Sequence, residues 1–91
     1  MSKTIWKFVL EFGDNPTARM PEGAQIVHAE IDSRVHSVYV WAIVDPAATL
    51  LTYEFILRGT GHQLPDYFGE HIATVLDTPF VWHLFRVSHV S

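Results

Sequence analysis

VHSVYVWAIVDP, at residues 35–46, holds the longest unbroken apolar run of the chain, from Val38 to Val44. The run consists mostly of β-branched and aromatic residues, and a turn signal closes it at each end. This length and composition predict a buried β-strand in preference to a short helix. The strands on either side can then be placed against this segment by the lengths of the turns that join them.

The rest of the chain also has the pattern of short strands. Residues 4–12 alternate with the period of a half-buried strand, with Trp6, Phe8, Leu10 and Phe12 on one face. Further strands are predicted at residues 17–20, 25–31, 50–58, 71–76 and 81–87, between turns rich in Gly, Pro, Asp and Asn. Residues 59–70 form the longest loop, with room for one helical turn at residues 66–70. We therefore expect one all-β domain over residues 1–91, an antiparallel meander of about six to seven strands curled into a barrel or sandwich.

Turn lengths give a register for the central strand. A three-residue turn puts Ile31 opposite Val35, and a second turn around Pro46 puts Trp41 opposite Tyr53. Both registers place the odd-numbered residues of the central strand in the core. The sequence thus predicts that Trp41 is buried.

The same registers place Glu30, His36 and Arg58 in one cross-strand row on the outer face. Glu30 beside His36 would favour the imidazolium and orient it for acid–base chemistry, while Arg58 could hold a phosphate or carboxylate. The alternative is a set of ion pairs across a solvated sheet face, which contributes from tenths of a kcal/mol to about 1 kcal/mol. Such pairs are far more common than catalytic rows.

A glycine-containing loop follows Arg58 and adds Thr60, Gly61 and His62 to the candidate binding residues. Its glycines would let backbone N–H groups point at an anion. The loop lacks the lysine and the following helix of a P-loop, so a simple turn at a strand end is the alternative. The six histidines show no metal-ligand spacing and the chain has no Cys, so no metal or other cofactor is expected. His83, within an apolar run, is expected to be a hydrogen-bonded core or edge residue.

Charge and hydropathy restrict the partners. The formal net charge is −4, from six Lys and Arg and ten Asp and Glu scattered along the chain, which disfavours binding to a nucleic-acid backbone. Stacking of bases on Tyr39 or Trp41 is also disfavoured if those rings are buried.

No apolar run approaches the roughly 20 residues of a membrane span, and the start of the chain does not resemble a signal peptide, so a cytoplasmic protein is expected. An open sheet would leave residues 4–12 or 81–87 at an edge, which favours a homodimer.

Several short segments of the chain resemble a family of small proteins of unknown function from tailed phages and bacterial prophages. The segments are IWK at residues 5–7, PEGA at 21–24, WAIVDP at 41–46, GTGH at 59–62 and VWHLF at 81–85. The resemblance implies a phage origin and a short stand-alone protein, and the family has no established activity. Without a catalytic motif, we expect a non-enzymatic phage accessory protein that binds a protein partner, such as a component of host defence or host metabolism. The alternative is a protein that binds or sequesters a small anionic ligand, a nucleotide or phosphate, or a small enzyme that uses the polar row.

Overall fold

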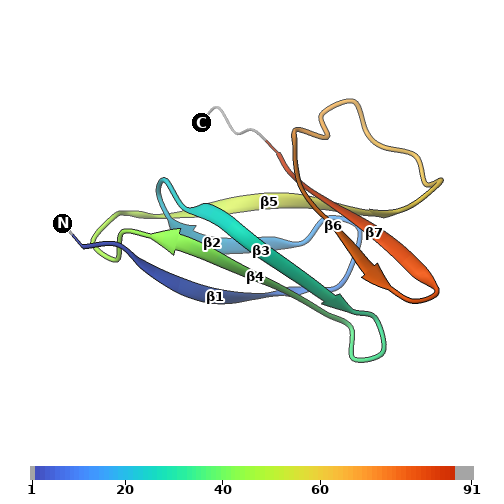
Figure 1. The fold of residues 1–91 in the computed structure, drawn as a ribbon. Coiled ribbons are helices and arrows are strands. Elements are labelled where there is room, and N and C mark those ends of the chain that lie inside the picture. Colours follow the sequence, from blue (N-terminus) through green and yellow to red (C-terminus); the bar gives the residue numbers. More distant parts are fainter. Residues whose placement is uncertain (1, 88–91) are drawn as a thin grey trace.

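The computed structural model describes residues 2–87, which form seven antiparallel strands and no helix (Figure 1). The strands are β1 (Thr4–Glu11), β2 (Thr17–Pro21), β3 (Gln25–Asp32), β4 (Ser37–Val44), β5 (Leu50–Gly59), β6 (Glu70–Asp77) and β7 (Phe80–Arg86). Within the loop before β6, a hydrogen bond of 3.2 Å from the Phe68 N–H to the Pro65 carbonyl closes a turn. The all-β prediction is confirmed. Over the described residues there is also no helix long and apolar enough to cross a membrane.

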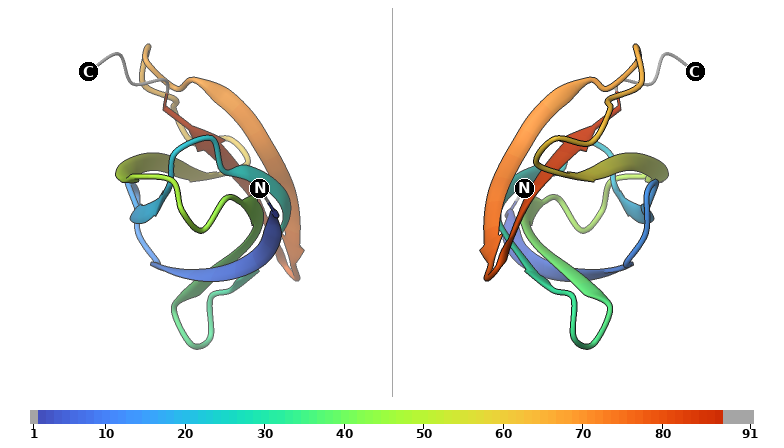
Figure 2. Two further views of the ribbon diagram at one scale, coloured as in Figure 1. Left: turned by 90° about the vertical axis from the view of Figure 1, so that its left-hand side faces the viewer. Right: turned by 90° about the vertical axis from the view of Figure 1, so that its right-hand side faces the viewer.

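The strands form two sheets that pack face to face as a sandwich. One sheet has the order β1-β4-β3 and the other has the order β2-β5-β7-β6. The views along the sandwich in Figure 2 show both sheets curving around a shared interior. At the borders, β3 lies beside β6 and β1 lies beside β2, but neither pair is joined by a strand ladder. The arrangement is therefore a sandwich and not a closed barrel.

The core lies between the sheets and is made of aliphatic side chains around one aromatic ring. From β4 it receives Val38, Val40, Ala42 and Val44, each 0–1% exposed. Phe55, Leu57 and Leu84 come from the opposite sheet. The predicted face of β1 points inward over most of its length, because Leu10 is buried and Phe8 and Phe12 pack against the core, whereas Trp6 near its start is exposed.

The predicted face of β4 is wrong, because the turn before it is longer than the sequence suggested. Ile31 pairs with Val38 and not with Val35, a shift of three residues. The turn includes His36 at a φ of 54°, in the left-handed region. Side chains alternate along a strand, so an odd shift moves every side chain to the other face. Trp41 consequently lies on the outer face.

The predicted pairing of β4 with β5 is also wrong. These strands belong to different sheets, and Tyr53 pairs with Ala18 of β2 instead of with Trp41. The turn chemistry was predicted correctly, since the Asp45 carboxylate accepts a hydrogen bond of 3.0 Å from the Ala47 N–H. The turn leads the chain into the second sheet and does not fold it back as a hairpin.

The edge strands differ in part from those expected. β7 lies between β5 and β6 and is not an edge strand, so the predicted pairing of two copies along residues 81–87 is excluded. β1 ends its sheet as expected, with β2 of the other sheet beside it.

Candidate functional site

The structure does not bring Glu30, His36 and Arg58 into one row. Glu30 lies on the outer face of β3, where its carboxylate is 3.3 Å from Nε2 of His28. His36 lies in the turn before β4, and its ring packs edge-on against Phe12 with the centroids 5.8 Å apart. Arg58 lies on β5 in the other sheet. The predicted row depended on the register between β3 and β4, and the longer turn before β4 makes that register wrong.

Arg58 holds the backbone of two loops against β5. Its guanidinium donates hydrogen bonds to the carbonyls of Asp14 at 2.7 Å, Leu57 at 3.0 Å and Gln63 at 3.2 Å. Hydrogen bonds from a charged donor are about twice as strong as neutral ones. We therefore assign Arg58 a structural role as the link between these loops and the strand.

The predicted anion loop is a tight turn in which the N–H groups of Gly59, Thr60 and His62 donate hydrogen bonds within the protein. The His62 N–H donates to the Gly59 carbonyl at 3.0 Å, and the Thr60 N–H donates to the Val81 carbonyl at 3.1 Å. The Gly59 N–H donates to Nδ1 of His62 at 3.3 Å. Gly61 has a φ of +90°, which favours glycine at this position. These contacts support the turn alternative for Thr60, Gly61 and His62.

Two histidines and two threonines form a hydrogen-bonded chain over the outer face of β6 and β7. Nε2 of His83 is 2.8 Å from the Thr60 hydroxyl, and its Nδ1 is 3.2 Å from the Thr74 hydroxyl. The Thr74 hydroxyl is also 3.0 Å from Nε2 of His71. His83 is hydrogen-bonded as predicted, but it lies on the outer face of the inner strand β7 and is neither a core nor an edge residue. A His that activates a hydroxyl is normally oriented by a carboxylate that stabilises its charged form, and a threonine cannot supply that charge.

Metal binding has no candidate cluster within residues 2–87. No group of three or more His, Asp or Glu side chains there is placed to hold a metal ion.

The outer face of the β1-β4-β3 sheet carries a group of aromatic and aliphatic side chains, which we call the aromatic face. Its centre is Trp41, paired across the strands with Lys7 on β1 and His28 on β3, and the next row is Val9, Tyr39 and Glu30. Ile5 and Ile43 continue it at the other end. Lys7 Nζ lies 4.5 Å from the Tyr39 ring centroid and 5.4 Å from that of Trp41. The His28 ring centroid is 5.3 Å from the Trp41 ring.

The aromatic face presents exposed apolar side chains to solvent. Its outer strand exposes Ile5 by 58% and Val9 by 64%. Tyr39, Trp41 and Ile43 of the central strand are partly exposed beside them. Sequence reasoning missed this face because it assigned the side chains at its centre, Tyr39, Trp41 and Ile43 of β4, to the core.

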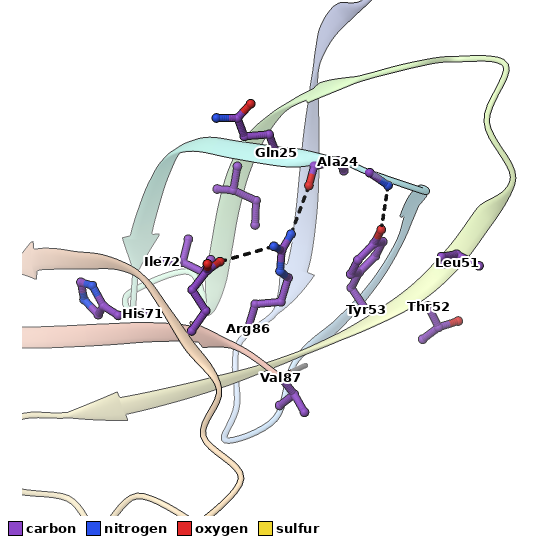
Figure 3. Close-up of a pocket in the computed structure, with 12 residues that line it drawn as sticks. Ala24, Gln25, Leu51, Thr52, Tyr53, His71, Ile72, Arg86 and Val87 are labelled. Atoms are coloured by element: carbon purple, nitrogen blue, oxygen red, sulfur yellow. Dashed lines mark hydrogen bonds and ion pairs between the residues drawn. The ribbon is translucent and has the colours of Figure 1, made fainter. Parts of the chain in front are cut away.

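A cleft lies where β3 and β6 meet at the border of the two sheets, and we call it the Arg86 cleft. It has a volume of about 930 Å³ and is lined by residues from β3, β5, β6 and β7 (Figure 3). The Arg86 guanidinium donates to the Ala24 carbonyl at 3.1 Å and to the Glu70 carboxylate at 3.3 Å. It also lies 5.7 Å from the centroid of the Tyr53 ring, whose hydroxyl accepts a 3.2 Å hydrogen bond from the Gly23 N–H.

The sequence contains little that would have revealed the Arg86 cleft. Arg86 ends a nearly continuous apolar strand, and Glu70 is sixteen residues before it. Their proximity depends on the pairing of Glu70 with Arg86 across the β6-β7 ladder. A correct β6-β7 register would have placed the two charges opposite each other, but it would not have placed Ala24 or Tyr53 beside them.

Comparison with known proteins identifies a family but no activity. Searches of curated proteins and of solved structures find no match to the chain. A protein-family model does match, over residues 1–91, and its description is a domain of unknown function, DUF7352. Because that match spans the whole chain, the protein belongs to the DUF7352 family.

Proposed function

We propose that this protein acts by binding a protein partner through the aromatic face, and not by catalysis. The observation that carries the proposal is the position of Trp41 and Tyr39 side by side in the middle of a sheet face that faces solvent. Tyr and Trp are the residues most often found to dominate the binding energy of protein interfaces, and they do so near the interface centre. Exposed Ile5 and Val9 extend the apolar area around them.

The charges around the aromatic face favour a protein over a nucleic acid. Lys7 lies over the rings, while Glu11, Glu30 and Asp32 follow along the same face. Asp32 is paired with Arg34 at 3.1 Å, so the face as a whole is mildly acidic. A polyanion needs a cationic surface to displace its counterions. A protein with an apolar centre and a few cationic side chains at its rim is the complement of this face.

The burial of the rings no longer argues against base stacking, since Tyr39 and Trp41 lie on the outer face. The case against a nucleic-acid partner therefore depends on charge alone. A labelled single-stranded oligonucleotide provides a direct check, because tight binding that is lost on Trp41→Ala would overturn the choice of a protein partner.

We further propose that the partner is a host or phage protein met in the cytoplasm of an infected bacterium. The support is the resemblance of WAIVDP, GTGH and VWHLF to segments of small phage and prophage proteins. Such a protein would act by occupying a surface of its partner. A component of host defence or host metabolism is the kind of target that such a protein would bind.

Capture from infected host lysate, followed by mass spectrometry, tests the proposal when it is repeated with two matched variants. Trp41→Ala removes the centre of the aromatic face. Tyr67→Ala removes an aromatic side chain that is 59% exposed on the loop before β6, and it serves as the control. The expected result is a protein retained by the parent and by Tyr67→Ala and lost by Trp41→Ala, with the same order of affinities for the purified pair in calorimetry. Equal retention by all three proteins, or recovery of no specific protein, would contradict the proposal.

A further inference from the structure

The Arg86 cleft lies between two edge strands that both have irregular pairing beside it. The ladder of β3 shifts register between Ile26 and His28, and that of β6 shifts between His71 and Ala73. A bulge leaves one residue out of the ladder and bends its strand, and bulges are frequent next to binding sites. Ile26, His71 and the bulged Ile72 line the cleft. The two strands thus border a recess at the point where a continuous sheet would have closed the sandwich.

The cleft contains one fixed cation with an exposed counter-ion. Arg86 is the one Lys or Arg and Glu70 the one carboxylate among the described residues that line it. The Arg86 side chain is 27% exposed, whereas that of Glu70 is 65% exposed. The bond to the Ala24 carbonyl and the contact with Tyr53 hold the guanidinium in place independently of Glu70. An exposed ion pair contributes little to stability, so Glu70 can turn into solvent at small cost.

We propose that the Arg86 cleft binds a small organic monocarboxylate, whose carboxylate group takes the place of Glu70 on the Arg86 guanidinium. The guanidinium is a planar fork that matches the two oxygens of a carboxylate. Ile26, Ile72 and the Tyr53 ring provide an apolar wall for the body of the ligand. Once Glu70 has moved away, the single positive charge of Arg86 remains, and a monoanion neutralises it. A dianionic phosphate would add excess negative charge to a protein whose formal net charge is already −4.

The proposal is independent of the aromatic face, because the two sites have no residue in common. The volume of the Arg86 cleft, about 930 Å³, falls within the range of about 300–1,000 Å³ that is usual for small-molecule sites. Loss of partner binding on Trp41→Ala would not change the expectation for the cleft. Failure of the cleft to bind a carboxylate would likewise not change the expectation for the aromatic face.

An NMR titration of the full chain tests the proposal, with benzoate as the probe, benzamide as its neutral counterpart and inorganic phosphate as the second anion. Benzoate should cause saturable shifts of the amide signals of Gly23, Ala24 and Ile72, which neither benzamide nor phosphate reproduces. Glu70→Gln removes the competing carboxylate and should tighten benzoate binding by about two- to fivefold, the range expected for an exposed ion pair. Arg86→Gln should abolish the saturable shifts.

A matched variant separates displacement of Glu70 from a general effect of charge. Glu22→Gln makes the same change in net charge at an exposed residue that precedes Gly23 and does not line the cleft. The proposal requires that Glu70→Gln tighten benzoate binding more than Glu22→Gln does. It is overturned if the two variants have equal affinity, if benzamide binds as well as benzoate, or if benzoate causes no saturable shift. Because Glu70 is exposed, its variant is expected to fold and to give a decisive result even if Arg86→Gln does not fold.

Discussion

Replacing an aromatic residue on the inner face of one sheet, by Phe55→Ala, and one on the outer face of the other sheet, by Trp41→Ala, is the sharpest test of which faces form the core. Phe55 is 0% exposed, and deleting a buried Phe side chain costs about 3–5 kcal/mol. Trp41 lies outside the core. Its replacement by Ala removes the contact with Lys7, which contributes about 0.5–1 kcal/mol, and the ring contacts with Tyr39 and His28, each of which contributes a similar or smaller free energy. The expected cost of Trp41→Ala is therefore about 1–2 kcal/mol.

The difference is large against the stability of the domain, which for 91 residues is about 5–14 kcal/mol. Equilibrium unfolding in urea, followed by circular dichroism, measures the two costs. With an m-value of about 1.5 kcal/mol per M, the midpoint should fall by about 2–3 M for Phe55→Ala and by about 1 M for Trp41→Ala. Phe55→Leu provides a milder core change should Phe55→Ala not fold. A cost of 3 kcal/mol or more for Trp41→Ala, or a smaller cost for Phe55→Ala than for Trp41→Ala, would refute the assignment of the two faces.

Three further predictions concern a carboxylate, a pair of glycines and an edge strand. Hydrogen bonds from Ser33 hold the pKa of Asp77 below its usual value, so this carboxylate stabilises the fold above about pH 4, and the contribution is lost as the pH falls through the lowered pKa. Acid unfolding of Asp77→Asn should accordingly be less steep than that of the parent. Gly69 and Gly61 both have a positive φ. A Cβ at Gly69 would collide with the backbone of Arg86, whereas a Cβ at Gly61 would have no atom within 4 Å. Gly61→Ala should therefore cost about 1–2 kcal/mol and Gly69→Ala clearly more, as thermal unfolding of the pair would show, and equal costs would contradict the geometry. If two copies pair along β1, light scattering should show a mass that rises toward the dimer at high micromolar concentration, and a constant monomer mass there would exclude the dimer.

The fold class could be predicted from the sequence because local signals determine where each strand begins and ends. The alternation from Trp6 to Phe12 and the turn residues around Pro46 both place strand limits close to those observed. The pairing of strands could not be predicted in the same way. A turn such as the one around Asp45 has the same local hydrogen bonds whether it leads into a hairpin or into the other sheet, so its sequence does not specify the next partner.

The candidate sites were derived from the predicted strand register, so they were wrong wherever that register was wrong. Residues of β4 are apolar on both faces, so alternation alone could not select the inner one. The face then depended on the length of the turn after Asp32, where His36 adopts a left-handed conformation that ordinary turn rules did not anticipate. Two separately derived registers agreed on the wrong face. Their agreement was uninformative, because the first assumed too short a turn and the second assumed a hairpin between β4 and β5 that does not form.

The choice of inner face on β4 has a physical reason that also bears on function. The inner positions are Val and Ala, and they pack against the larger Phe55 and Leu84 of the opposite sheet, so that small and large side chains fill the space between the sheets. With that space filled, the Tyr39 and Trp41 rings have no room inside and lie over the outer face, where Lys7 covers part of their area. Packing alone would be satisfied by polar residues at those two positions, as on the solvated face of an ordinary antiparallel sheet. Large rings kept where they add little to the core are better explained by a partner that covers them, and the comparison of Trp41→Ala in stability and in binding separates these two roles.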